Sequence, residues 1–160
     1  MPSPDKPKAR FWSARARDRT TMVGLDGDEG GHARPMTGQF EDEHSPIWFF
    51  AAIDGDLVTH LAEHDPAVAT FTAKGYDPAA NVHGKLSLDT DPAVANRLWN
   101  SPIAAWCAGN DDSKPAPLRL DYEKAEIRRA GSSLTACIKT TPGHDPKRDY
   151  AENVATVALD

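Results

Sequence analysis

The sequence predicts a mainly β protein, an antiparallel barrel, closed or split, with only a few short helices. Many short runs rich in β-branched and aromatic residues are separated by turn residues, a pattern typical of sheet proteins. Helical periodicity is confined to two or three stretches that do not alternate with the strands. The chain contains no GxGxxG motif, so a dinucleotide-binding α/β fold is not expected.

The composition is that of a single globular domain. The chain has 160 residues, of which 39% are hydrophobic and 26% charged, and one core usually serves about 100–150 residues. The longest uncharged apolar run, residues 47–53, is too short to cross a bilayer, and the basic N-terminus lacks the apolar core of a secretory signal. We therefore expect a cytoplasmic protein with no membrane partner.

The charge distribution argues against a nucleic-acid partner. The chain carries 18 basic and 24 acidic residues, a net charge of −6, whereas nonspecific binding to nucleic acid depends on neutralising phosphates with Lys and Arg. Basic residues do gather within positions 1–19, and we interpret this segment as a solvated arm.

The first elements are a leader, a helix and a hairpin. Residues 1–9 are rich in proline and are expected to form a disordered leader before a single domain over residues 10–160. Phe11 and Trp12 open that domain on a short helix to about residue 17. Two strands then form a β-hairpin around the Asp26-Gly27 pair. Pro35 lies in the second of them, which predicts an edge, a bulge or an unpaired position.

Two further helices are expected between the strands. Asp56 is interpreted as the N-cap of a helix over residues 56–64, and the Asp65-Pro66 pair as its end. Another helix begins with the cap-then-proline pair Asp91-Pro92. Its predicted apolar face consists of Val94, Ala95, Leu98 and Trp99. The strands are expected at residues 20–25, 33–40, 47–53, 67–72, 82–88, 118–122, 125–129, 134–140 and 154–159.

Motifs for metal binding and for catalysis by side chains are weak. His60, Glu63 and His64 match an HxxEH zinc pattern, but the helix is short and no third ligand is placed nearby, so we do not expect a metal. Cys107 and Cys137 are interpreted as ordinary reduced thiols. No nucleophile motif is present. If the protein is an enzyme, a bound cofactor therefore supplies the chemistry.

The basic residues around the middle of the barrel suggest where an anion would bind. Arg34 and Lys74 bracket a long stretch that contains no Lys or Arg but many acids. Both suit a phosphate, Arg as a bidentate fork and Lys as a point charge. Each is equally well interpreted as a strand-end charge in water. Most of the tryptophans and phenylalanines are expected to pack in the core, and one or two to cover a planar ring or fill a dimer interface.

Several strings together resemble one family. They are TTMVGL, GHARPMTGQFED, PIWFF, KGYD, HGKL, ANRLWN, AAW and HDPKRDY. The chain is similar to the general stress proteins among the pyridoxamine-phosphate-oxidase-like flavoproteins over residues 11–159. The resemblance implies a six-stranded FMN-binding split barrel and a homodimer with two cofactor sites at its interface.

The same resemblance implies which residues hold FMN. They are Arg34, Pro35, Met36 and Thr37 on one strand, Trp48, Phe49, Phe50 and Ala51 on another, Lys74, and either Trp99 or Trp106 from the partner subunit. The chain differs from the family where members often carry Thr or Ser, at Ala51-Ala52, and in an acidic loop, Asp54-Gly55-Asp56, that is often basic. Both differences bear on affinity for FMN rather than on the fold.

The resemblance implies a stress-linked, flavin-dependent oxidoreductase with an unassigned substrate. Vitamin B6 oxidation is not expected, because the C-terminal substrate-binding segment of the true oxidases is not found. Three alternatives remain open: a protein that holds flavin without turnover as a store or redox sensor, the same fold binding haem or a deazaflavin, and a dimeric scaffold without a cofactor.

Overall fold

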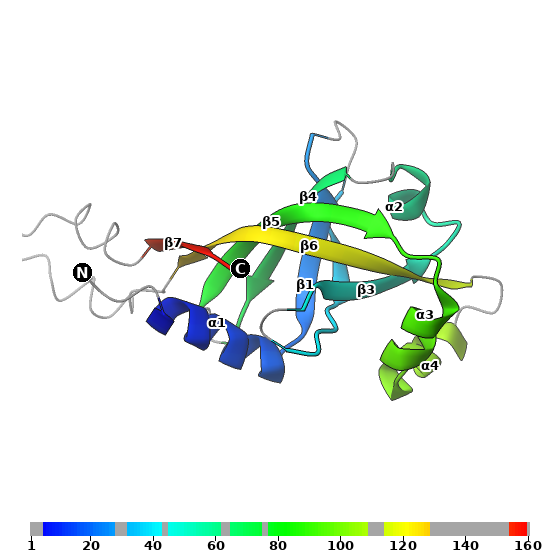
Figure 1. Ribbon diagram of the computed structural model, residues 1–160, viewed down its shortest axis with the longest axis horizontal. Coiled ribbons are helices and arrows are strands. Elements are labelled where there is room, and N and C mark those ends of the chain that lie inside the picture. Colours follow the sequence, from blue (N-terminus) through cyan, green and yellow to red (C-terminus); the bar gives the residue numbers. More distant parts are fainter. Residues whose placement is uncertain are drawn as a thin grey trace, which may run out of the picture.

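The computed structural model describes residues 5–27, 32–42, 45–61, 65–74, 77–108, 114–128 and 154–159, with the backbone alone for residues 106–108. Its elements follow the chain in a simple order (Figure 1). They are α1 (Asp5–Arg17), β1 (Thr20–Leu25), β2 (Arg34–Thr37), β3 (Ile47–Ala52), α2 (Asp56–Thr59), β4 (Asp65–Thr72), β5 (Ala79–Leu88), α3 (Pro92–Leu98), α4 (Ser101–Ala108), β6 (Pro115–Arg128) and β7 (Val154–Ala158).

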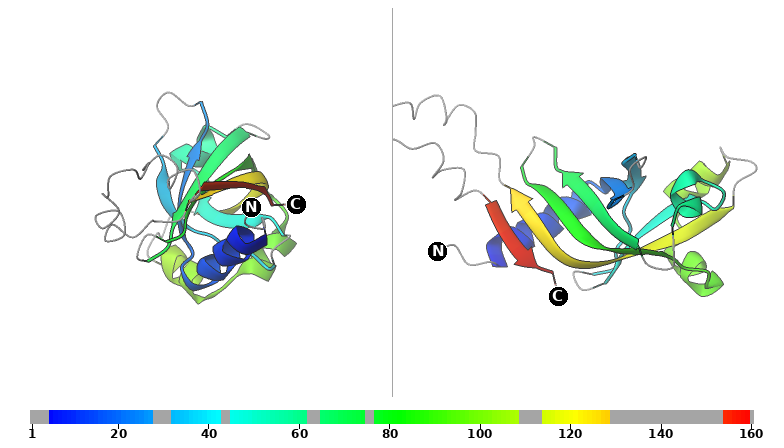
Figure 2. Two further views of the ribbon diagram at one scale, coloured as in Figure 1. Left: turned by 90° about the vertical axis from the view of Figure 1, so that its left-hand side faces the viewer. Right: turned by 90° about the horizontal axis from the view of Figure 1, so that it is seen from above.

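The described strands form one antiparallel, seven-stranded sheet that wraps around a core, as the end-on view of Figure 2 shows. Six strands follow one another in the order β2-β1-β4-β5-β6-β3, and β7 pairs with β6. Figure 1 shows α1 near the end that carries β7, and α3 and α4 at the opposite end. The mainly β, antiparallel architecture predicted from the sequence is therefore confirmed.

The first hairpin forms as predicted. β1 pairs with β2, with Met22 opposite Pro35, and Gly27 in the turn has a φ of 83°, a value that glycine adopts without strain. β2 is the outermost strand of the path, so Pro35, which has no backbone N–H to donate, occupies an edge.

Helix α1 packs against the sheet through two aromatic residues. Phe11 and Trp12 are buried, and their rings lie 6.0 Å from that of Phe71 and 5.7 Å from that of Tyr122, respectively. The predicted helix ending near residue 17 is confirmed. It begins at Asp5, so it includes residues 5–9 of the segment for which disorder is expected; Pro7 is compatible with a first helical turn.

Arg15 on α1 is almost fully buried, at 1% exposure. Its Nη1 donates to the Thr21 hydroxyl, and its guanidinium lies 5.8 Å from the ring centre of Phe40 and 5.0 Å from that of Phe71. Burial lowers the pKa of Arg15 to about 10, which still leaves it charged near neutral pH. Its aromatic neighbours partly replace the water that the cation loses.

The helix predicted from Asp91-Pro92 is present as α3. The Asp91 side chain accepts a hydrogen bond from the Ala93 N–H (2.9 Å), and Val94 and Leu98 are buried. Trp99 was expected on the same apolar face, and this is wrong. It follows the last helical residue in an extended conformation and is 48% exposed.

The predictions for residues 56–66 need correction. α2 covers only Asp56–Thr59; Gly55 is its N-cap, with no side-chain cap, and Asp56 is the first helical residue. Residues 62–64 of the predicted helix lie outside the described residues. Asp65 and Pro66 do not end a helix but begin β4, where Asp65 pairs with Leu86. Long-range pairing with β5 outweighs the local preference of an Asp-Pro pair for a turn.

The two strands predicted at residues 118–122 and 125–129 are one strand, β6. The register with β5 shifts between His83 and Gly84, so that Glu123 has no partner opposite it. Burial alternates through Leu118 and Leu120, then resumes one position out of phase at Ala125. A β-bulge of this kind resembles a turn in the sequence pattern. The strand predicted at residues 134–140 lies outside the described residues, and the one predicted at residues 154–159 is present as β7.

Candidate functional site

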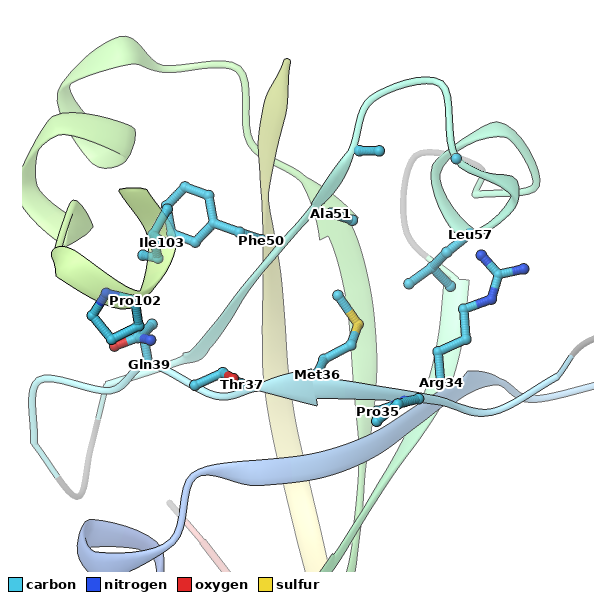
Figure 3. A pocket seen from close by; sticks show the side chains of 12 residues that line it. Arg34, Pro35, Met36, Thr37, Gln39, Phe50, Ala51, Leu57, Pro102 and Ile103 are labelled. Carbon is cyan, nitrogen blue, oxygen red and sulfur yellow. The ribbon is translucent and has the colours of Figure 1, made fainter. Parts of the chain in front are cut away.

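One pocket, of about 340 Å³, lies between β2, β3, α2 and the first turn of α4 (Figure 3). This volume is within the usual range for small-molecule sites. Its lining is mostly apolar, with polar groups toward its ends. The lining residues are Arg34, Pro35, Met36, Thr37, Gln39, Phe50, Ala51, Ala52, Gly55, Leu57, Pro102 and Ile103.

Strand β2 supplies one wall because it is an edge strand. One of its edges pairs with β1 and the other faces the pocket. Met36, which is half-buried, also packs against the main core. Figure 3 shows its side chain pointing into the middle of the pocket, with Arg34 at one end of the row and Gln39 at the other.

Strand β3 supplies the opposite wall through Phe50, Ala51 and Ala52. Its position is fixed by pairing with β6, in which Ala51 lies opposite Ala116. A second constraint is a bridge between Gln39 and Trp48, which joins the segment after β2 to β3 through two backbone hydrogen bonds of 2.7 Å. The spacing between the two walls is therefore set by backbone hydrogen bonds.

Two helices complete the apolar lining. Leu57 of α2 is 7% exposed and reaches the pocket beside Arg34, while Pro102 and Ile103 of α4 lie at the Gln39 end (Figure 3). Helix α4 was not predicted. The Asn100 side chain accepts a hydrogen bond from the Ile103 N–H (3.2 Å) and caps the helix. An Asn followed two residues later by Pro102 is a sequence pattern that indicates the start of a helix.

At one end of the pocket Arg34 forms an ion pair. Its Nη2 lies 2.9 Å from Oδ2 of Asp56, and the two side chains are 37% and 77% exposed. Arg34 is the only cationic side chain in the described lining. Its guanidinium suits an anionic oxygen, and here the Asp56 carboxylate of the same chain provides that oxygen.

At the other end Gln39 is buried and its orientation is fixed. Its Oε1 accepts hydrogen bonds from Nη1 of Arg19 (2.9 Å) and from Nδ2 of Asn100 (3.1 Å). Because Oε1 already accepts two hydrogen bonds, the group that Gln39 can offer to a ligand is the amide donor Nε2. The pocket therefore combines apolar walls, a donor at one end and a cation at the other.

The structure brings together six of the eleven residues predicted for the site. They are Arg34, Pro35, Met36, Thr37, Phe50 and Ala51. Phe49 and Trp48 of the same strand do not line the pocket. Phe49 is in the main core, and Trp48 packs with Val94 and Leu98.

Three other predicted site residues are not among those lining this pocket. Lys74 is exposed after β4, and Trp99 is exposed at the end of α3. Trp106 is in α4, with its side chain outside the described part of the chain. The two tryptophans are expected to act from a partner subunit, so their prediction concerns an assembly of two chains.

Five lining residues were not identified from the sequence, namely Gln39, Gly55, Leu57, Pro102 and Ile103, and a sixth, Ala52, was named only as a difference from the family. Gln39 lies only two residues after Thr37, but the pattern gave no sign that its amide would be buried and oriented. The other four belong to α2, the turn before it and α4, whose position against β2 is a matter of tertiary packing.

The lining residues restrict what the site can do chemically. None of those described is a His, Cys, Lys or Tyr. Within the described residues no group of three potential ligands is placed to hold a metal ion, and His60 contacts the Asp56 backbone oxygen through Nδ1 (2.7 Å). The arrangement suits an apolar ligand with an anionic group, and any bond-making step would depend on that ligand.

In the described residues no helix has the length and apolar character needed to cross a bilayer.

Comparisons with known proteins agree on one family. A family model described as pyridoxamine 5'-phosphate oxidase like matches residues 6–144. A general stress family protein of Xanthomonas campestris pv. campestris is 48% identical, with a TM-score of 0.75, over 89% of this chain and 100% of that one. The general stress FMN/FAD binding protein of Xanthomonas citri is 45% identical, with a TM-score of 0.72, over 87% and 99%.

A more distant structure shows the same fold. General stress protein 26 of Jannaschia sp. CCS1 is 23% identical, with a TM-score of 0.69, over 96% of this chain and 99% of that one. No curated protein matches the sequence.

Proposed function

The chain belongs to the pyridoxamine 5'-phosphate oxidase-like family, and from this we propose that its pocket binds FMN and that it acts as a flavin-dependent oxidoreductase of the general stress type. The family resemblance and the split-barrel fold expected from the sequence are confirmed. The cofactor, the reaction and the assembly are our proposals.

One observation carries the proposal. The strand that the resemblance assigns to the flavin, β2 (Arg34–Thr37), forms a wall of the pocket, and Phe50 and Ala51 from the second assigned strand lie opposite it. These residues were selected from the sequence without regard to any cavity. Because residues of both assigned strands line the same pocket, a flavin site in that pocket is supported. The FMN/FAD binding protein of Xanthomonas citri, 45% identical, supports the same cofactor class.

The donor set of the pocket fits FMN. The apolar side chains of Met36, Phe50, Leu57 and Ile103 suit a planar, largely apolar ring. Nε2 of Gln39 can donate to a ring carbonyl, and Arg34 at the other end suits the phosphate. With one cation in the described lining, the pocket matches the single phosphate of FMN better than the diphosphate of FAD.

The residues of this chain would bind and orient the flavin rather than react. A bound flavin supplies electron transfer. The two walls would hold the ring on both faces, Leu57 and Ile103 would exclude water, and Gln39 would fix its orientation. A homodimer with sites at its interface would complete the enclosure, with Trp99 or Trp106 of the partner subunit covering the open side; the 48% exposure of Trp99 in the single chain supports this role.

One observation also favours an alternative, a flavin store or redox sensor. The described lining contains no His, Cys, Lys, Tyr, Asp or Glu, so no proton donor for a substrate is at hand. Under anaerobic conditions, bleaching of bound FMN by NADH or NADPH, followed by reoxidation with a second acceptor, would support the oxidoreductase. Flavin that binds but is reduced by neither nucleotide would support the store or sensor.

The visible spectrum of the protein tests the cofactor. The purified protein is mixed with FMN, FAD or riboflavin and passed through a gel-filtration column. We expect flavin absorption bands to elute with the protein after FMN and to be weaker after FAD. A colourless protein after all three flavins would contradict the proposal and leave haem, a deazaflavin or a scaffold without cofactor to be tested.

A further inference from the structure

We propose that Asp56 is a built-in competitor for the anion site of the pocket, and that it lowers affinity for a phosphate-bearing flavin while leaving a neutral flavin unaffected. The inference rests on the proposed function, because it concerns the FMN phosphate. In this role Asp56 would influence whether the pocket prefers a flavin with a phosphate or a neutral flavin.

The position of Asp56 follows from a tight turn after β3. The Gly55 N–H donates to the Ala52 carbonyl (2.9 Å), and a Cβ added to Gly55 would lie 3.1 Å from that oxygen. The chain therefore turns within three residues and enters α2 at Asp56. This places the Asp56 carboxylate at the Arg34 end of the pocket, 2.9 Å from the guanidinium.

Arg34 cannot hold the carboxylate and a phosphate in the same way at once. Its Nη2 already donates to Asp56, and a bidentate contact with phosphate needs two adjacent N–H groups. Arg34 is the only cation among the described lining residues, so the pocket offers no second cation to take over. An entering phosphate must displace Asp56 or share the fork with it.

The competition is expected to be moderate. The pair is exposed on both sides, and exposed ion pairs are weak. Asp56 is therefore readily displaced, but its charge stays near the phosphate and repels it at a distance where water screens only part of the interaction. Removing the charge should raise FMN affinity by about three- to tenfold, a size typical of exposed charges.

The test compares Asp56→Asn with Asp54→Asn. Both variants remove one negative charge from the same loop, and Asp54 is exposed and forms no ion pair with Arg34. The substitution does not change the backbone of position 56, whose carbonyl accepts a hydrogen bond from the Thr59 hydroxyl (3.1 Å). The dissociation constants of FMN and riboflavin are measured by quenching of flavin fluorescence at fixed ionic strength.

We expect Asp56→Asn to tighten FMN by about three- to tenfold and to leave riboflavin unchanged, with a clearly smaller effect of Asp54→Asn. In an Arg34→Ala background, the gain from Asp56→Asn should shrink, because part of it comes from freeing the guanidinium. Equal effects of the two Asn variants on FMN, or an equal effect of Asp56→Asn on riboflavin, would overturn the competitor role.

Different results would contradict the role of Asp56 and the proposed flavin binding. If the wild-type protein binds FMN and Asp56→Asn does not bind it more tightly, only the role of Asp56 is lost. If neither the wild type nor Asp56→Asn binds FMN or riboflavin, the proposed function fails and the inference fails with it. Thermal melts of all variants establish that each protein is folded.

Discussion

Gln39 and Trp48 exchange two backbone hydrogen bonds, each 2.7 Å long, and so join the two ends of the six-strand path. Among the described residues no other strand pairing joins β2 to β3 along this seam, and the pocket lies there. Thr37 and Gln39 line it from one side of the seam, and Phe50 and Ala51 from the other. The pocket therefore lies in the split of the barrel, and the bridge sets the width of that split.

Replacing Arg34 with Ala should weaken FMN binding by about 1–3 kcal/mol, the usual loss for a charged hydrogen bond, and leave riboflavin binding nearly unchanged. Arg34→Lys should be intermediate, because it keeps the charge but loses the fork. Lys74→Ala is the matched comparison, since Lys74 is exposed and does not line the pocket in the single chain. Equal losses for Arg34→Ala and Lys74→Ala in a fluorescence titration would argue against a phosphate contact at Arg34.

Replacing Gln39 with Glu should weaken the binding of both FMN and riboflavin by about 1–2 kcal/mol. Glu keeps an oxygen acceptor for Arg19 and Asn100 but puts a second acceptor where the amide donor Nε2 stands. Urea denaturation should therefore show a folded protein of similar stability. Unchanged affinity for both flavins would remove Gln39 from the contact with the ring.

Replacing Trp99 with Ala should weaken FMN binding by about 1 kcal/mol, from the loss of an aromatic contact across a dimer interface. Met22→Ala is the control, because Met22 is also exposed (40%, against 48% for Trp99) and, although it lies opposite Pro35 on β1, it does not line the pocket itself. Light scattering reports the mass in parallel. A monomer whose FMN affinity is the same with and without Trp99 would contradict the proposed closure by a partner.

Replacing Gly38 with Ala should lower the free energy of unfolding by about 1–3 kcal/mol. A Cβ at this position would clash with Nη2 of Arg15, whose side chain is buried at 1% exposure. In an Arg15→Met background the same change should cost much less, because the guanidinium that it meets is gone. Urea denaturation of the four proteins measures the coupling, and an equal cost in both backgrounds would show that Arg15 is not the obstacle.

Much of the sheet was predictable because its strands carry local signals. β1 has the predicted bounds, and α3 begins at Pro92 with Asp91 as its N-cap, as the cap-then-proline pair indicates. The errors occur where long-range contacts decide. Asp65-Pro66 looks like the end of a helix but pairs with β5, and the bulge at Glu123 looks like a turn between two strands. Neither outcome is encoded in the residues next to it.

The part of the pocket lining that comes from β2 could be predicted from the sequence. The four residues of β2 were identified together, since they are contiguous and the family resemblance covers them. Leu57, Pro102 and Ile103 come from two helices that meet β2 only in the folded chain. The ion pair between Arg34 and Asp56 joins positions 22 residues apart. A sequence shows both charges, but it does not show that they meet.

The most direct test of the flavin site is a crystal structure of the protein grown with FMN. We expect the ring in the seam between β2 and β3, beside Met36 and Phe50, with its phosphate at Arg34 and the Asp56 carboxylate displaced. Flavin bound at a place not lined by β2, or a phosphate held by another residue while Arg34 still pairs with Asp56, would contradict this expectation.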